Sequence, residues 1–363
     1  MQKTLLSVLF QFVVFLVSAQ WVPTTKVTAP IFELQEHANK LYCSGYGGVF
    51  VSSDQGVNWK RIDNTGDPIL HTKIVNDFQI NAGNFYFRLS GSFYKSINLG
   101  KSYKGLSTEF CENYVLNGDE IMMVTSTSNS QAVKFSFDGG ASWKIITANL
   151  PNNTPIRRLL FYQNLYYVLY ASGDLYVSPD KGQSWKNEAT GLGLLDVNIS
   201  DNKAFAVAKN AMYYHDAASS SWIKIPLNGT PEHISAIGTT LFAPLNDTTL
   251  LRSDDLGKNW YPLLVGQHLF WPNRYYKKIF VTSKGTLFAA SDLGASYSKD
   301  GGYSWTPVNN EGFFLQGCWS VSVAGDNILA GYNNGGIQVY LLVKIIHSLG
   351  KVVTLSDKYS LLK

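Results

Sequence analysis

Short apolar runs alternate with polar residues along most of the chain. Within each run, apolar and polar positions follow each other with a period of two, and glycine, asparagine or aspartate separates one run from the next. The runs of the first unit are residues 31–36, 40–44, 48–52 and 59–62, and later units repeat this order. Alternation over about five residues between turn residues predicts β-strands. We therefore expect an all-β chain in which any helix is confined to the two ends.

A motif of eight residues, Ser-x-Asp-x-Gly-x-(Ser/Asn)-Trp, begins at the end of the third run in most units. Five full copies end at Trp59, Trp143, Trp185, Trp260 and Trp305, a softer copy ends at Tyr103, and a degraded one ends at Trp222. Successive aromatic positions are 37 to 45 residues apart. Four short antiparallel strands in ~40 residues correspond to one blade of a β-propeller.

The residue types of the motif indicate a turn. Its third position holds Asp54, Asn98, Asp138, Asp180, Asp255 and Asp300. Serine and aspartate oxygens can accept hydrogen bonds from backbone N–H groups in a tight turn, and glycine can adopt a positive φ. The tryptophan ring can then pack where the next strand begins. The motif is therefore predicted to be structural rather than catalytic.

This motif resembles the Asp-box, also called the BNR repeat. Sialidases, sortilin-type receptors, xyloglucan-cleaving glycosidases and photosystem II assembly factors carry it on β-propellers. The resemblance covers nearly the whole chain after residue 19. It implies a single β-propeller of four-stranded antiparallel blades.

The number of motif copies does not by itself give the number of blades. Residues 335–340 repeat the third-strand pattern of residues 47–52 without the motif that would follow it. The segment Trp21-Val22-Pro23 is similar to the segments that begin fourth strands at Trp260 and Trp305. We expect eight blades, with the N-terminal strand as the outer strand of the last blade, because that pairing removes exposed strand edges. Seven blades with the extra run as a cap is the alternative.

The first nineteen residues have the pattern of a signal peptide. Lys3 precedes an apolar run over residues 5–17, and Val17-Ser18-Ala19 offers small residues for cleavage. This run is shorter than the roughly 20 residues that span a bilayer. The predicted division is a signal peptide over 1–19, a propeller over 20–341 and a tail of uncertain structure over 342–363. The mature protein is expected to be secreted, periplasmic or on the cell surface, without a membrane span.

Composition excludes several classes of protein and ligand. The chain is 45% hydrophobic, 14% aromatic and 15% charged, which excludes a disordered, coiled-coil or collagen-like chain. A formal charge of +4 without a concentrated basic stripe gives no indication of nucleic acid. Cys43, Cys111 and Cys318 lie in apolar runs and are predicted to be buried. No cysteine or histidine pair has metal-ligand spacing, so we expect no metal and no cofactor.

Two connections between predicted blades are rich in aromatic residues. They cover residues 266–276 and 311–319 and flank the seventh unit on the face opposite the motif turns. Aromatic rings beside polar side chains suit sugars or peptides. The predicted ligand-binding residues are Trp271, Arg274, Tyr275, Tyr276, Asp292, Glu311, Phe313 and Phe314. Packing of these rings between blades is the alternative.

The favoured function is an exported, non-catalytic propeller that binds a glycan or a protein, as a monomer. A glycoside hydrolase is the alternative, but the Arg-Ile-Pro segment of sialidases does not occur. Xyloglucan-cleaving relatives place two carboxylates across a cleft between two propellers, and this chain has length for one. No spacing singles out a catalytic carboxylate pair, so no catalytic residue is assigned. A structural or adhesive module of the cell surface is a third class.

Overall fold

The computed structural model describes most of the chain between residues 21 and 341. The described residues are 21–23, 31–62, 73–126, 130–146, 149–152, 154–200, 203–209, 211–216, 221–226, 235–237, 239–244, 249–264, 278–281, 286–291, 294–307, 318–324, 327–332 and 337–341. Their secondary structure is entirely β, as the alternating pattern predicts. The described part of the chain contains no helical segment that could span a membrane.

The described strands pair as eight four-stranded antiparallel sheets, numbered here in chain order. The first sheet contains β2 (Ile31–His37), β3 (Lys40–Gly45), β4 (Gly48–Ser52) and β5 (Lys60–Arg61). The second contains β6 (Val75–Asn81), β7 (Asn84–Leu89), β8 (Ser92–Ser96) and β9 (Lys104–Ser107), and the third β10 (Phe110–Asn117), β11 (Glu120–Ser126), β12 (Gln131–Ser136) and β13 (Lys144–Ile145). The fourth contains β14 (Ile156–Tyr162), β15 (Leu165–Tyr170), β16 (Leu175–Ser178) and β17 (Lys186–Asn187).

The later sheets repeat the same order. The fifth contains β18 (Leu194–Ser200), β19 (Lys203–Ala208), β20 (Ala211–Asp216) and β21 (Ser221–Ile225), and the sixth β22 (Ser235–Ile237), β23 (Thr240–Pro244), β24 (Thr249–Ser253) and β25 (Tyr261–Leu264). The seventh contains β26 (Lys278–Val281), β27 (Leu287–Ser291), β28 (Gly294–Ser298) and β29 (Thr306–Pro307). The eighth contains β30 (Cys318–Ala324), β31 (Asn327–Tyr332), β32 (Ile337–Leu341) and β1 (Trp21–Pro23).

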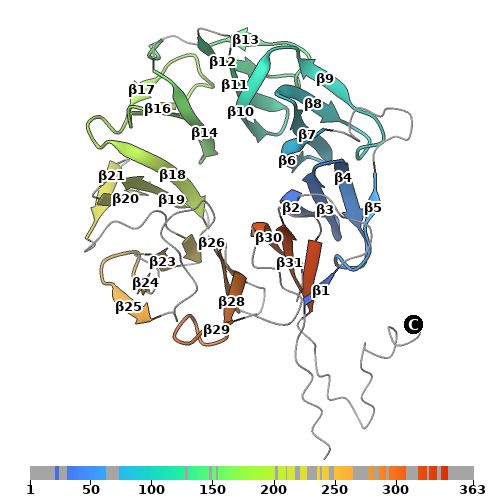
Figure 1. Ribbon diagram of the computed structural model, residues 1–363. Helices are drawn as coiled ribbons and strands as arrows, with labels where there is room; N and C mark the ends of the chain where they lie inside the picture. The colour runs from blue at the N-terminus through green and yellow to red at the C-terminus, as the bar shows by residue number, and fades with distance from the viewer. Residues whose placement is uncertain are drawn as a thin grey trace, which may run out of the picture.

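The sheets stand side by side around a central opening. Figure 1 shows the first strands β2, β6, β10, β14 and β18 nearest to the opening, with β5, β9 and β13 on the outside. The two ends of the described chain meet in the eighth sheet, where Trp21 pairs with Tyr340 and Val22 with Val339. The predicted pairing of the N-terminal strand with the last repeat is therefore present. It gives β32 a partner on the edge that would otherwise be open.

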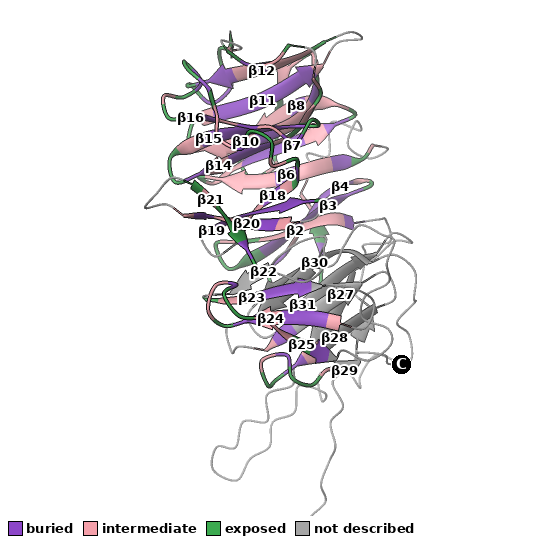
Figure 2. Cartoon of the chain, turned by 90° about the vertical axis from the view of Figure 1, so that its left-hand side faces the viewer, coloured by how far each residue is buried: buried purple, intermediate pink, exposed green. Residues whose placement is uncertain are grey.

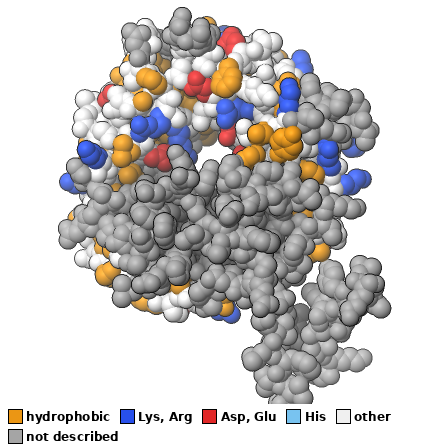
Figure 3. Space-filling view, in the orientation of Figure 1, with side chains coloured by type: hydrophobic (Ala, Val, Ile, Leu, Met, Phe, Trp, Pro, Cys, Tyr) orange, Lys and Arg blue, Asp and Glu red, His pale blue; other side chains and the backbone are white. Residues whose placement is uncertain are grey.

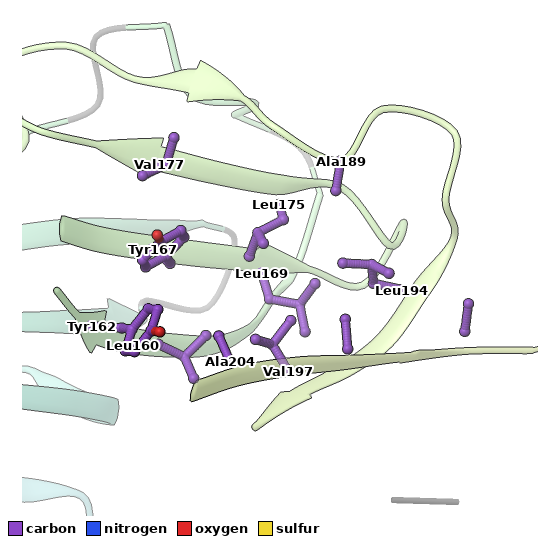
Figure 4. Packing of buried hydrophobic residues seen from close by; sticks show 12 residues of the cluster. Leu160, Tyr162, Tyr167, Leu169, Leu175, Val177, Ala189, Leu194, Val197 and Ala204 are labelled. Carbon is purple, nitrogen blue, oxygen red and sulfur yellow. The ribbon is translucent and has the colours of Figure 1, made fainter. Parts of the chain in front are cut away.

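The hydrophobic core lies between neighbouring sheets. Leu160 and Tyr167 of the fourth sheet pack in one cluster with Val197 and Ala204 of the fifth, as Figure 4 shows. Similar clusters join the first sheet to the second, the second to the third, the third to the fourth and the fifth to the sixth. Burial is concentrated along the strands, while the turns are largely exposed (Figure 2). Each seam between sheets is thus a unit of the core.

The two cysteines whose side chains the structure describes are part of the buried core. Cys43 of β3 and Cys111 of β10 are free and fully buried, as predicted. Cys43 packs in an apolar cluster of the first sheet, and Cys111 packs in the cluster between the second and third sheets. They behave as small hydrophobic side chains.

Candidate functional site

The sequence motif forms a closed turn between the third and fourth strands of a sheet, here called the repeat turn. In the first sheet, Ser52 Oγ donates to Asp54 Oδ1 at 2.7 Å and accepts the Gly56 N–H at 2.8 Å. Asp54 Oδ1 also accepts the Asn58 N–H at 2.8 Å. The same three contacts recur in the turns that begin at Ser136, Ser178, Ser253 and Ser298. In the softer copy, Asn98 takes the place of the aspartate between Ser96 and Ser102.

The motif glycine is required for two reasons. Gly182 has a φ of 85°, directly after Lys181 at 59°. A Cβ on Gly182 would also lie 2.8 Å from Cγ2 of Ile146, which belongs to the preceding sheet. Only glycine satisfies both the backbone conformation and the close approach of the neighbouring sheet. The repeat turn therefore also sets how closely two sheets pack.

The aspartates of the repeat turns are fully engaged in these turns. Hydrogen bonds from the backbone and side chain of Asn259, with one from Ser253, lower the pKa of Asp255 to about 2. The pKa of Asp180 is lowered first by the side chain and backbone N–H of Ser184. A carboxylate held by three donors in a surface turn is poorly suited to transfer a proton near neutral pH. These contacts assign the motif carboxylates to the geometry of the turn.

The structure does not describe the ligand-binding residues that the sequence predicts. Trp271, Arg274, Tyr275, Tyr276, Asp292, Glu311, Phe313 and Phe314 all lie outside the described residues. The candidate site must therefore be built from the part of the same face that the first five sheets form.

That face, here called the collar face, lies opposite the repeat turns. It consists of the turns between second and third strands and the starts of the first strands. The Cys111 N–H donates to Gly91 O at 2.7 Å, and the Leu194 N–H donates to Gly173 O at 3.0 Å. These bonds tie the first strand of one sheet to the second turn of the sheet before it. Backbone contacts therefore cross the second–third and fourth–fifth seams on the collar face.

Most first strands contain a β-bulge close to the collar face. The bulges lie at Ile31/Glu33, Asn76/Gln79, Cys111/Asn113, Ile156/Arg158, Leu194/Asp196 and Cys318/Ser320. A bulge leaves one residue unpaired in the ladder and redirects its side chain. The unpaired backbone groups then need partners from outside their own sheet.

Acceptor side chains from the preceding sheet bind backbone N–H groups at or next to two of these bulges. Glu33 Oε1 accepts the Asp77 N–H at 2.9 Å between the first and second sheets. Gln131 Oε1 accepts the Ile156 N–H at 2.7 Å between the third and fourth sheets. A carboxyl oxygen and an amide oxygen thus perform the same task at two seams.

At the other two seams among the first five sheets, arginine side chains donate hydrogen bonds to backbone carbonyl oxygens of the next sheet. Arg88 Nη1 donates to Cys111 O at 2.9 Å, across the second and third sheets. Arg157 Nη1 donates to Leu195 O at 2.5 Å, across the fourth and fifth sheets. At least one polar side chain therefore links each pair of neighbouring sheets among the first five.

The charged groups of the collar are concentrated around Glu33. Burial raises the pKa of Glu33 to about 7, although hydrogen bonds from Ser44 Oγ and the Asp77 N–H oppose the shift. Asp77 forms an ion pair with Arg88 and has a φ of 50°. A perturbed carboxyl beside a residue in the left-handed region is typical of functional sites. Glu33, Asp77 and Arg88 thus form one linked charged group at the seam between the first and second sheets.

Other collar charges are paired with neighbours. Arg158 Nη1 lies 2.8 Å from Asp196 Oδ1, and Lys134 Nζ lies 2.5 Å from Glu109 Oε1. In the coloured part of Figure 3, basic and acidic side chains lie near each other around the central opening. The described collar therefore carries paired charges of both signs rather than an extended region of one charge.

Apolar side chains are exposed beside these charges. Tyr46, Ile74, Phe110 and Leu195, here called the collar rim, are each 40–53% exposed. Tyr46 and Ile74 form a bridge between the first and second sheets, and Phe110 and Leu195 lie at the starts of later first strands. The described residues contain no group of three or more histidine, cysteine or acidic side chains that could hold a metal. Apolar contact and fixed polar groups are what the described collar offers a ligand.

The sequence contained a weak signal for this site. Charged residues interrupt the first run of several units, at Glu33, Asp77, Arg157 and Asp196. First strands of a ring face a restricted inner space, so a charge there needs a partner on the next sheet. Pairing across sheets cannot be derived from the period of the runs alone, and the residues therefore escaped prediction.

Comparison with known proteins agrees with the architecture. Residues 98–234 match the family model of the DUF6242 beta propeller domain. The chain folds as a β-propeller. No curated protein matches the sequence significantly.

Several solved structures share the fold. A structure of YCF48 bound to D1 peptide has a TM-score of 0.51 and 15% identity, covering 90% of this chain and 97% of that one. The Dos1 propeller has a TM-score of 0.61 and 9% identity, covering 89% and 96%. An ancestral GH74 enzyme has a TM-score of 0.55 and 16% identity, covering 89% of this chain and 55% of its own. At these identities the similarity concerns the fold.

Proposed function

We propose that this protein is an exported, non-catalytic Asp-box propeller that binds a partner, a protein segment or a glycan, on its collar face. The collar rim carries the proposal, because it exposes apolar side chains beside fixed charges on a rigid ring. This combination is typical of recognition surfaces. Export rests on the signal-peptide pattern of residues 1–19.

Two further observations support binding rather than catalysis. The Asp-box carboxylates are held by hydrogen bonds within their own turns. YCF48, which shares the fold, has been solved with a peptide bound. Trp271, Tyr275, Phe313 and Phe314 would extend the collar rim on the same face and are proposed as additional contacts.

A glycoside hydrolase is the second candidate, and Glu33 is the observation that favours it. A carboxyl whose pKa is about 7, close to the ion-paired Asp77, has features of a general acid beside a second carboxylate. A GH74 enzyme shares the fold. Against it, both oxygens of Glu33 accept hydrogen bonds from Ser44 and Asp77, which ties this carboxyl to the seam.

The test compares ligand binding by wild type and collar variants. The purified protein is screened on a glycan array and against defined peptides, and the affinity of each hit is measured. Tyr46→Ser with Leu195→Ser should weaken a true ligand by tenfold or more, as loss of exposed anchor residues does. Ile223→Ser, which removes a similarly exposed apolar side chain from the outer strand β21, should leave the affinity unchanged.

Each outcome discriminates between the candidates. Unchanged affinity in the collar double variant would show that the ligand binds elsewhere. Trp271→Ala tests the proposed extension of the rim separately. Hydrolysis of a polysaccharide by wild type, abolished in Glu33→Gln, would replace the binding proposal with the glycosidase.

A further inference from the structure

Two neighbouring repeat turns carry exposed apolar side chains at a position that is otherwise polar or proline. The residue directly after the motif serine is Ser53, Pro179, Asp254 or Lys299 in the first, fourth, sixth and seventh turns. In the second and third turns it is Ile97 and Phe137, which are 76% and 42% exposed. Phe137 stacks on the buried Phe135 of its own sheet, with ring centroids 5.6 Å apart, whereas Ile97 is mostly exposed.

Leu99 in the second turn is a third exposed apolar side chain. Its φ of 56° belongs to the turn, since Gln55 and Lys181 at the same position have φ values of 58° and 59°. Leu256 has the same conformation in the sixth turn, but it packs against an apolar cluster. Leu99 is 42% exposed instead, so it adds apolar surface to the second turn.

The two turns lie side by side on the face opposite the collar. Lys95 of β8 donates from Nζ to Gly139 O at 3.3 Å, which links the second sheet to the third turn. A Cβ on Gly140 would lie 2.6 Å from Leu106 Cδ1 of β9. Ile97 and Leu99 of the second turn and Phe137 of the neighbouring third turn are together called the tip patch here.

Lysines surround the tip patch. Lys101, Lys104 and Lys144 are exposed and have no ion-pair partner among the described residues. The nearby Asp138 carboxylate is occupied by hydrogen bonds from Ser136 and Ser142, and Asp119 is the exposed carboxylate close to Gly139. The patch thus combines apolar tips with an excess of positive charge.

The size of the patch argues against a stable protein partner. Three apolar side chains are far fewer than the ~20–30 residues a side of such an interface. A few apolar side chains inserted at the headgroup boundary, with lysines attracted to anionic lipid, suffice for reversible membrane contact. We propose that the tip patch docks the protein on an anionic lipid surface, with the collar face turned away from it.

Vesicle binding tests this proposal. The full chain is sedimented with vesicles of phosphatidylcholine alone and of phosphatidylcholine mixed with phosphatidylglycerol. Binding is expected only to the mixed vesicles and should weaken with added salt. Ile97→Ser with Phe137→Ser should lower the partition coefficient at least tenfold, since both apolar tips are lost. Lys299→Ser, at the same turn position in the seventh sheet, is the matched control and should bind like wild type.

A second variant separates binding from folding. Leu99→Gly places glycine at a positive φ, as in the third and seventh turns, and should keep the melting temperature within a few degrees of wild type. It should nevertheless bind mixed vesicles several-fold more weakly. The proposal is overturned if wild type does not bind the mixed vesicles, or if the tip-patch variants bind as well as Lys299→Ser. Salt-insensitive binding to pure phosphatidylcholine would also contradict it.

Discussion

His215 Nε2 lies 3.5 Å from Glu188 Oε1 in the seam between the fourth and fifth sheets. Their side chains are only 3% and 13% exposed. In the fifth sheet, Tyr214 pairs with Phe205, the third residue of β19. His215 is the next residue along β20, so it stands opposite the second residue of β19. In the fourth sheet, Ser178 pairs with the second residue of β15. His215 therefore occupies the position of the motif serine in a sheet whose third and fourth strands continue as a hairpin.

Glu188 also departs from the residue type that the other seams have at its position. It is the third residue after the motif tryptophan, Trp185. The corresponding residues at other seams are Ile62, Leu106, Ile146, Ile225 and Leu263, and each contacts the motif glycine of the next sheet. Because the fifth sheet lacks that glycine, a buried polar pair replaces the apolar contact. Within the described part of the chain, both nitrogens of His215, and Oε2 of Glu188, have no hydrogen-bond partner.

Two substitutions can replace the His215–Glu188 pair with the serine and the apolar residue that the other seams have at these positions. His215→Ser alone leaves the buried Glu188 carboxyl without its neighbour, and we expect it to lower the free energy of unfolding by about 1–3 kcal/mol. Glu188→Leu combined with His215→Ser removes the buried carboxyl as well and should be at least as stable as wild type. Denaturant unfolding measures both. A single variant as stable as wild type would show that the pair contributes nothing.

The positions of the repeat turns could be predicted because the motif is local. Ser178, Asp180 and Gly182 lie within one turn, and their chemistry specifies its hydrogen bonds. Glu33 and Asp77 are 44 residues apart and meet only because two sheets stand in a fixed register. The same holds for Glu188 and His215: the sequence showed a degraded motif, but the matching change in the preceding sheet depends on packing between sheets.

Glu33 predicts a specific dependence of stability on pH. Its pKa in the folded state is about 7, above the ordinary 4.5, so the folded state holds the proton more tightly. Stability from this residue is therefore complete below about pH 4.5 and is lost as the pH rises toward 7. The loss is on the order of 3 kcal/mol.

Glu33→Gln should remove this loss without disturbing the seam. Its amide oxygen can accept the Asp77 N–H, as Gln131 accepts that of Ile156. Its amide nitrogen can donate to Ser44. Unfolding curves at pH 5 and pH 8 should differ less for the variant than for wild type. An equal difference would place the titration on another group.

The buried serine of a repeat turn should matter more than its exposed counterpart. Ser178 is fully buried, and Ser178→Ala leaves the buried Gly182 N–H without its acceptor. We expect a loss of about 1–3 kcal/mol in the free energy of unfolding. Ser184→Ala removes an exposed hydroxyl that donates to Asp180 Oδ2, and water can replace it. Equal effects of the two substitutions would contradict this account of the turn.

The repeat-turn aspartates predict sensitivity to acid. The pKa of Asp255 is lowered from 3.8 to about 2, first by the Asn259 N–H. A lowered pKa stabilises the fold above about pH 4, and that contribution disappears as the pH falls toward 2. Asp255→Asn should flatten this part of the pH profile and lower the melting temperature at neutral pH, while ligand affinity per folded molecule stays unchanged. Loss of ligand binding at an unchanged melting temperature would instead assign Asp255 to the binding site.

The N-terminal strand should be essential for closing the ring. β1 contributes Trp21, Val22 and Pro23 to the eighth sheet, and β32 has no other partner on that edge. A chain beginning at residue 24 would expose the edge of β32, and unpaired edges recruit other chains. We expect this chain to melt several degrees lower and to aggregate, whereas a chain beginning at residue 20 should behave as the intact ring. Calorimetry and light scattering on the two truncations separate these outcomes. If the shorter chain stays monomeric with an unchanged melting temperature, the β1–β32 pairing is not what closes the propeller.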